Sequence, residues 1–91
     1  MSHFSLIWHA EFKKSHDAIS KKYKGFADVW CGVEWALTTN PVKFSDFFNK
    51  GEGFGVISTR KRPDVPALRI AYKLHPKYVE VFAMEIIQEN G

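Results

Sequence analysis

The stretch that decides the fold is Leu68-Arg69-Ile70-Ala71-Tyr72-Lys73-Leu74, in which a large apolar side chain occupies every second position. Neighbouring side chains of a β-strand point to opposite faces, so this pattern predicts a strand over residues 67–74. The large apolar side chains share one face: Leu68, Ile70, Tyr72 and Leu74. The other face carries Arg69, Ala71 and Lys73. The sequence therefore predicts a sheet with one apolar face and one charged face.

Two further strands are expected, one on each side of this stretch in the sequence. Residues 54–62 form the first and end at Pro63-Asp64-Val65-Pro66; residues 78–87 form the second, after the connection His75-Pro76-Lys77. Consecutive strands that are joined by short connections pair antiparallel. The three strands are therefore expected to form an antiparallel meander.

Two helical stretches precede these strands. The first has its less polar side chains at helical spacing: Phe12, Ser15, His16, Ile19 and Tyr23. The second repeats that spacing: Phe26, Val29, Trp30, Val33 and Leu37. Gly25 separates the two stretches, and Asn40-Pro41 ends the second because the residue before a proline disfavours the helical conformation. The sequence predicts a helical hairpin with one apolar stripe on each helix.

The chain opens with a further period-2 segment, residues 4–9, which predicts an N-terminal strand. Residues 41–53 are expected to connect the second helix to the sheet, with at most one short helical turn. The expected fold class is α+β with two layers. The N-terminal strand and the helical hairpin pack on a twisted antiparallel sheet, in the order β-α-α-β-β-β.

Length and composition predict one domain that spans residues 1–91. With 45% apolar and 25% charged residues, the chain falls outside the disordered, collagen-like and low-complexity classes. No apolar run approaches the length of a membrane span, and the lone Cys31 has no partner for an intrachain disulfide. We therefore expect a cytoplasmic protein with no membrane association.

Basic residues gather in two blocks. Residues 13–24 hold five lysines and one acidic residue, and residues 60–77 hold six basic residues and one acidic residue. A small domain with two basic blocks can attract phosphate groups or an acidic partner. For the first block, a solvated helix face is the simpler explanation.

The second block contains the strongest candidate site. Arg60 and Arg62 are two residues apart on the expected strand 54–62 and so share a face, and Arg69 and Lys73 share a face of the next strand. If these strands pair, the three arginines converge near one open sheet surface. Guanidinium groups there would bind phosphate and stabilise charge during phosphoryl transfer. A solvated strand end is the alternative explanation.

Candidates for acid–base chemistry are fewer. Cleavage of RNA by its own 2′-hydroxyl needs one group to take a proton and another to protonate the leaving oxygen. The nearby choices are Lys61, Lys73, His75 and Glu85. Glu85 shares an expected strand face with Val81 and Ala83, and a structural ion pair is its simpler role.

No metal or cofactor is expected. The four histidines lack the spacing of metal ligands. Residues 51–55, Gly-Glu-Gly-Phe-Gly, lack both the Lys-Ser/Thr and the following helix of a phosphate-binding loop. His16 lies on the apolar stripe of the first helix and is expected at the edge of the core.

Four local motifs occur in a fixed order along the chain. They are Ile7-Trp8-His9-Ala10-Glu11-Phe12-Lys13-Lys14, Asn40-Pro41, Leu68-Arg69-Ile70-Ala71-Tyr72-Lys73 and Val79-Glu80-Val81-Phe82-Ala83-Met84. In this order, and with the β-α-α-β-β-β arrangement, they resemble the RelE/ParE superfamily of toxins from bacterial type II toxin–antitoxin systems. The resemblance covers essentially the whole chain.

The resemblance implies a function. The RelE-like branch cleaves messenger RNA, usually in the ribosomal A site, with basic residues in place of a metal. By this resemblance Arg69 would stabilise the transition-state phosphate, and Arg60 and Arg62 would take part in binding and catalysis. The expected RNA-binding residues are Lys61, Lys73 and Lys77. The preferred hypothesis is a metal-independent mRNA endoribonuclease that acts on translated mRNA and is neutralised by a cognate antitoxin.

Two alternatives stay open. RelE-like nucleases usually follow the last strand with Arg, His or Tyr, whereas residues 86–91 of this chain read Ile-Ile-Gln-Glu-Asn-Gly. A ParE-like toxin that binds DNA gyrase without catalysis, or an inactive toxin relative, would not need those residues. In each toxin hypothesis the antitoxin is expected to be an acidic, partly disordered chain that folds as it binds.

Overall fold

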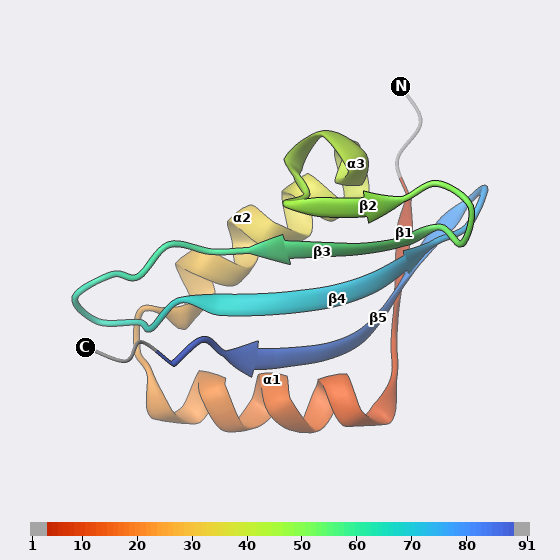
Figure 1. Cartoon of the computed structure of the whole chain (residues 1–91). Coiled ribbons are helices and arrows are strands. Elements are labelled where there is room, and N and C mark those ends of the chain that lie inside the picture. The colour runs from red at the N-terminus through yellow and green to blue at the C-terminus, as the bar shows by residue number, and fades with distance from the viewer. Residues whose placement is uncertain (1–3, 89–91) are drawn as a thin grey trace.

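The computed structural model describes residues 4–88, which form a small α+β fold with three helices and a five-stranded mixed sheet (Figure 1). The elements are β1 (Ser5–Trp8), α1 (Ala10–Lys22), α2 (Phe26–Thr39), α3 (Pro41–Phe44), β2 (Phe47–Asn49), β3 (Phe54–Ser58), β4 (Leu68–Leu74) and β5 (Tyr78–Ile86). The strand order is β1-β5-β4-β3-β2. Helices α1 and α2 lie on one face of the sheet, and within residues 4–88 no helix covers the other, open face.

The sheet differs from the expected antiparallel one in two ways. The β3-β4-β5 meander is confirmed, but β1 pairs parallel to β5, with Leu6 opposite Val79. Parallel pairing is possible here because a long connection, residues 9–77, joins β1 to β5. The sheet also gains β2, which pairs antiparallel with β3. With three residues, Phe-Phe-Asn, β2 is too short to show a period-2 pattern.

The two long helices follow the sequence prediction closely. Asn40 ends α2, and Pro41 begins α3 in the first helical position, where a proline needs no amide hydrogen. The Asn40 side chain caps α3 by accepting a hydrogen bond from the backbone amide of Lys43 at 3.3 Å. The expected helical turn in residues 41–53 is therefore α3.

The core lies between the helices and the covered face of the sheet. Its largest fully buried side chains come from both layers: Phe12, Phe26, Leu37, Val65, Leu68, Ile70, Tyr72, Val79 and Val81. Trp8 and Trp30 extend this core with a T-shaped ring contact at 5.5 Å between centroids. Burial of this apolar surface is the main driving force for folding.

A bulge in β5 decides which of its side chains reach the open face. Ala71 pairs with Ala83 and Tyr72 pairs with Val81, so Phe82 is left without a partner across β4. Val81 and Met84 are both buried, whereas Phe82 and Ala83 between them are not. A bulge re-aims side chains in this way. Val81 therefore does not share a face with Ala83 and Glu85, contrary to the sequence prediction.

Tyr72 connects the centre of the sheet to α3. Its side chain is fully buried, and its hydroxyl donates to the carbonyl oxygen of Pro41 at 3.2 Å and also hydrogen-bonds the Ser45 hydroxyl. Burial raises the pKa of the Tyr72 phenol, so the hydroxyl stays protonated at neutral pH and can donate. Opposite Tyr72 in β3 lies Gly55, where the ring passes directly over the backbone.

His16 lies at the edge of the core, as predicted. Its ring packs against four aromatic rings: Trp8, Phe12, Phe26 and Trp30. Neither ring nitrogen of His16 has a hydrogen-bond partner. Burial lowers the pKa of His16 below 6.5, and the nearby Asp17 carboxylate offsets this effect only in part.

We expect His16 to make the folded state less stable as the pH falls below 6.5. Below pH 6.5 the imidazole of His16 is protonated in the unfolded chain but not in the folded one, because its pKa is lower when it is buried. The free energy of unfolding therefore decreases as the pH falls below 6.5, and this contribution is constant above 6.5. Urea unfolding between about pH 5 and pH 8 measures this slope. The His16→Leu variant should lose less stability across that range, and equal slopes for both proteins would contradict the assignment.

Candidate functional site

The open face of the sheet carries three rows of side chains that cross the strands. We call the end of the sheet next to loop 59–67 the loop end, and the end next to the β4–β5 turn at residues 75–77 the turn end. From the loop end to the turn end, the rows are Ser58-Arg69-Glu85, Val56-Ala71-Ala83 and Phe54-Lys73-Glu80. Ile7 of β1 continues the third row beside Glu80 and is 47% exposed. The middle row is apolar, and the charged groups lie in the two outer rows.

The third row contains a carboxylate held between two histidines. Glu80 Oε2 lies 2.8 Å from His9 Nε2, and Glu80 Oε1 is hydrogen-bonded to His75 Nε2. These two hydrogen bonds are the main reason that the pKa of Glu80 is lowered, so the carboxylate is ionised at neutral pH. We call these three residues the His–Glu–His cluster.

Three separate elements bring the cluster together. His9 is the residue between β1 and α1, and its backbone amide donates to the carbonyl oxygen of Val81 at 3.1 Å. His75 lies in the tight turn between β4 and β5, which is closed by the bond from its amide to the Tyr78 carbonyl at 2.9 Å. Parallel pairing of β1 with β5 is what places His9 next to Glu80.

Aromatic rings fix the orientation of both histidines. The His75 ring stacks on Tyr78 with centroids 4.2 Å apart, and the His9 ring lies 4.5 Å from that of Phe82. Because each histidine uses Nε2 toward Glu80, its Nδ1 is left for another partner. Histidine is suited to proton transfer because its ordinary pKa lies near physiological pH. The cluster can therefore move protons at two ring nitrogens.

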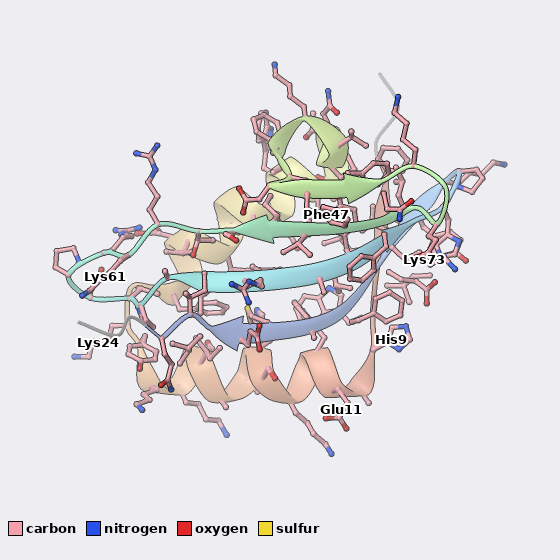
Figure 2. The ribbon with its side chains drawn as sticks, in the orientation of Figure 1. His9, Glu11, Lys24, Phe47, Lys61 and Lys73 are labelled. Atoms are coloured by element: carbon pink, nitrogen blue, oxygen red, sulfur yellow. The ribbon has the colours of Figure 1, made fainter. Side chains whose placement is uncertain are left out.

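A depression of about 520 Å³ lies beside the cluster on the same face. It is lined by Gly51, Glu52, Phe54, Lys73 and Phe82. Figure 2 shows Lys73 and His9 at the same end of the sheet. One ammonium group and two aromatic rings therefore lie around a depression beside the His–Glu–His cluster.

Arg69 lies at the other end of the open face. Its guanidinium donates to Glu85 Oε1 at 3.1 Å across the strands, and both side chains are at least half exposed. This is the structural ion pair that the sequence favoured for Glu85. Arg69 and Lys73 share the open face as predicted, but they are four positions apart along β4, which separates them by about 13 Å.

Arg60 and Arg62 do not join Arg69, contrary to the expected convergence of the three arginines. Strand β3 ends at Ser58, so both residues lie in the following loop, 59–67, and the alternation of a strand does not govern them. The backbone amide of Arg62 donates to the carbonyl oxygen of Val65 at 2.8 Å and closes a tight turn. Arg62 Nε lies 3.6 Å from Asp64 Oδ1. The physical reason for the error is that β3 ends at Ser58, before Arg60, and not at the Pro63–Pro66 segment as expected.

The three expected RNA-binding lysines are also divided. Lys73 and Lys77 lie at the turn end of the sheet, near His75, whereas Lys61 lies in the loop at the opposite end (Figure 2). The turn end therefore combines the two lysines with the histidines. Of the predicted acid–base candidates, Lys73 and His75 are brought together, and Lys61 and Glu85 lie elsewhere.

Arg60 and Arg62 line a second depression, of about 380 Å³, on the helical side of the molecule. Its other walls are a mostly apolar part of α2 that also contains Asp28, Phe44 of α3 and the end of β3 that β2 does not cover. Trp35 and Phe44 lie beside each other near this site, 57% and 39% exposed, with ring centroids 5.4 Å apart. We call this site the α2–β3 groove.

Comparison of the chain with protein-family models, with curated proteins and with solved structures finds no match. Within residues 4–88, no group of three or more His, Cys, Asp or Glu is arranged to hold a metal ion. In the same part of the chain no helix is long and apolar enough to cross a membrane. Of the C-terminal residues 86–91, Glu89, Asn90 and Gly91 lie outside the described residues.

Sequence reasoning missed His9 and Glu80 as site residues. Glu80 alternates with the buried Val79 and Val81, which signals an open-face position next to Lys73. His9 has no comparable signal, because its place depends on the parallel pairing of β1 with β5. The site depends on a contact between residues 71 positions apart.

Proposed function

We propose that this chain is a metal-independent endoribonuclease that cleaves RNA through attack of the 2′-hydroxyl on the adjacent phosphorus. The observation that carries the proposal is the His–Glu–His cluster beside Lys73 on an uncovered sheet face. Two histidines positioned by one carboxylate meet the requirement of this reaction for both a base and an acid.

The proposed reaction uses one neutral and one protonated histidine. Nδ1 of the neutral ring takes the proton of the 2′-hydroxyl, and the oxygen then attacks phosphorus. Nδ1–H of the protonated ring donates to the 5′-oxygen as the P–O5′ bond breaks. The products are a 2′,3′-cyclic phosphate and a 5′-hydroxyl. Glu80 acts as a positioning residue, because it accepts from Nε2 of both rings and holds their orientation.

Basic side chains on the same face would hold the RNA backbone. Lys73 pairs across the strands with Glu80, and its ammonium group would bind the phosphate that is cleaved at the cluster. Arg69, about 13 Å further along β4, would instead bind a phosphate further along the RNA chain. This proposal changes the role expected for Arg69, which was stabilisation of the transition state at the cleaved phosphate.

The biological setting that we propose is a RelE-like toxin of a type II toxin–antitoxin system. Its substrate would be translated mRNA in the cytoplasm, its site of action the ribosome, and its inhibitor an acidic cognate antitoxin. What supports this setting is the resemblance in the order of the sequence motifs, together with an uncovered sheet face that carries Arg69 and Lys73.

A second candidate function, protein binding without catalysis, is favoured by the α2–β3 groove. Its apolar floor, its two arginines and the exposed rings of Trp35 and Phe44 are typical of a surface that receives another protein. A ParE-like toxin that binds DNA gyrase, or an inactive relative that still binds its antitoxin, would use such a surface.

The test of the proposed function is cleavage of a reporter mRNA in a translating extract, with new ends mapped by primer extension. We expect cleavage within translated codons that leaves 2′,3′-cyclic phosphate ends. An RNA whose nucleotide 5′ to the cleaved bond carries 2′-deoxyribose should stay intact, because it lacks the attacking hydroxyl. Intact mRNA in the presence of folded protein would contradict the nuclease and favour the binding function.

A further inference from the structure

We propose that the depression on the open face is a nucleobase pocket that selects guanine. The proposal rests on the proposed function only for the class of ligand, RNA. The pocket is bounded by Phe54 and Phe82, by Lys73, and by the turn that contains Gly51 and Glu52. None of these residues except Lys73 has a part in the proposed cleavage step.

The two aromatic rings provide a stacking surface. Phe54 is on the open face of β3, and the β5 bulge turns Phe82 toward the same face. Phe82 is supported from one side by the His9 ring, 4.5 Å away. Aromatic side chains stack on any base, and a lysine nearby attracts its phosphate. The two phenylalanines and Lys73 would provide affinity for any nucleotide, so selection of the base would come from the turn that contains Gly51 and Glu52.

Glu52 provides the selection. An ionised carboxylate only accepts hydrogen bonds, and its two oxygens can accept from two parallel N–H groups. Guanine offers such a pair on its Watson–Crick edge, N1–H and the 2-amino group. Adenine and cytosine have an acceptor next to their amino group, and uracil has a single N–H between two carbonyls. Unstacked bases are commonly read on this edge.

The turn that carries Glu52 is held by several hydrogen bonds. Asn49 Oδ1 accepts from the amides of Gly51 at 2.9 Å and Glu52 at 3.2 Å. Gly53 adopts φ +74, which favours glycine, and its carbonyl accepts from the amide of Leu74 at 2.7 Å. The turn is therefore preorganised, so that little conformational entropy is lost when Glu52 binds a base.

The experiment titrates the ¹⁵N-labelled full chain with GMP, AMP, CMP and UMP and follows the amide signals of Gly51, Glu52 and Lys73. We expect GMP to bind about tenfold or more tightly than the other three nucleotides. In Glu52→Gln, GMP should bind more weakly while AMP binds equally well or better, because a repulsive charge is removed. The Phe54→Leu variant should bind all four nucleotides more weakly, because it lacks one of the two stacking rings.

The matched control is Glu11→Gln, which makes the same change of charge on α1, on the helical side of the molecule (Figure 2). It should keep the preference for GMP. Equal affinity for all four nucleotides, no change of these signals at millimolar nucleotide, or stronger GMP binding by Glu52→Gln would each overturn the proposal. GMP selectivity without RNA cleavage would overturn the proposed function alone, and cleavage without GMP selectivity would overturn only the pocket.

Discussion

Replacing His75 by alanine is expected to lower kcat/KM for RNA cleavage by about 10²- to 10⁴-fold, with the fold retained. The variant removes one of the two groups that transfer protons in the proposed step. His9→Ala should have an effect of the same order. Because the two rings act in the same step, the double variant should lose much less than the product of the two single losses.

The pH dependence of cleavage distinguishes this catalytic role from a structural one. A base and an acid together give a bell-shaped profile of kcat/KM, and each single variant should remove one of its two limbs. Glu11→Gln serves as the control and should keep both the rate and the bell shape. If His75→Ala, shown to be folded by its melting temperature, cleaves RNA as fast as the unmodified chain, the assignment of the cluster is wrong.

Gly55→Ala is expected to destabilise the fold by about 1–3 kcal/mol, the largest stability effect that we predict for a single methyl group. A Cβ atom at this position would lie 2.4 Å from Tyr72 Cζ and 2.5 Å from the Tyr72 hydroxyl oxygen. The Tyr72 ring is fully buried and its hydroxyl is bonded to Pro41 and Ser45, so it cannot move aside without loss of those bonds. Chemical unfolding measures the change.

Gly32→Ala is the matched control for this methyl group. Gly32 lies within α2, and a Cβ atom there meets nothing within 4 Å. Alanine is favoured over glycine in the interior of a helix, so this variant should be more stable by about 0.5–1 kcal/mol. Equal stability of Gly55→Ala and the unmodified chain would show that Tyr72 does not pack over the β3 backbone as described.

The two predictions separate the two layers of the molecule. Tyr72 faces the covered side of β4, and Lys73 faces the open side beside the His–Glu–His cluster. Gly55→Ala should therefore lower the free energy of unfolding and leave the cleavage rate of the folded protein almost unchanged. His75→Ala should lower the cleavage rate and leave the free energy of unfolding almost unchanged. A rate measured at a temperature well below unfolding keeps the two effects apart.

The sequence by itself determined the elements whose pattern is long and periodic. Apolar residues recur over three turns in α1 and in α2, and large side chains alternate through β4, so burial of one face leaves one local structure for each. The open face with Arg69 and Lys73, the ion pair of Glu85 and the place of His16 followed from the same patterns.

Only the tertiary structure decided how these elements meet. Parallel pairing of β1, the addition of β2 and the bulge at Phe82 depend on contacts between distant residues, for which a local period carries no signal. These contacts bring His9 to Glu80 and turn Phe82 outward, and the end of β3 at Ser58 leaves Arg60 in a loop away from Arg69. Side-chain patterns report which face of an element is buried, whereas a site is made where several elements converge, and that convergence is set by packing of the whole chain.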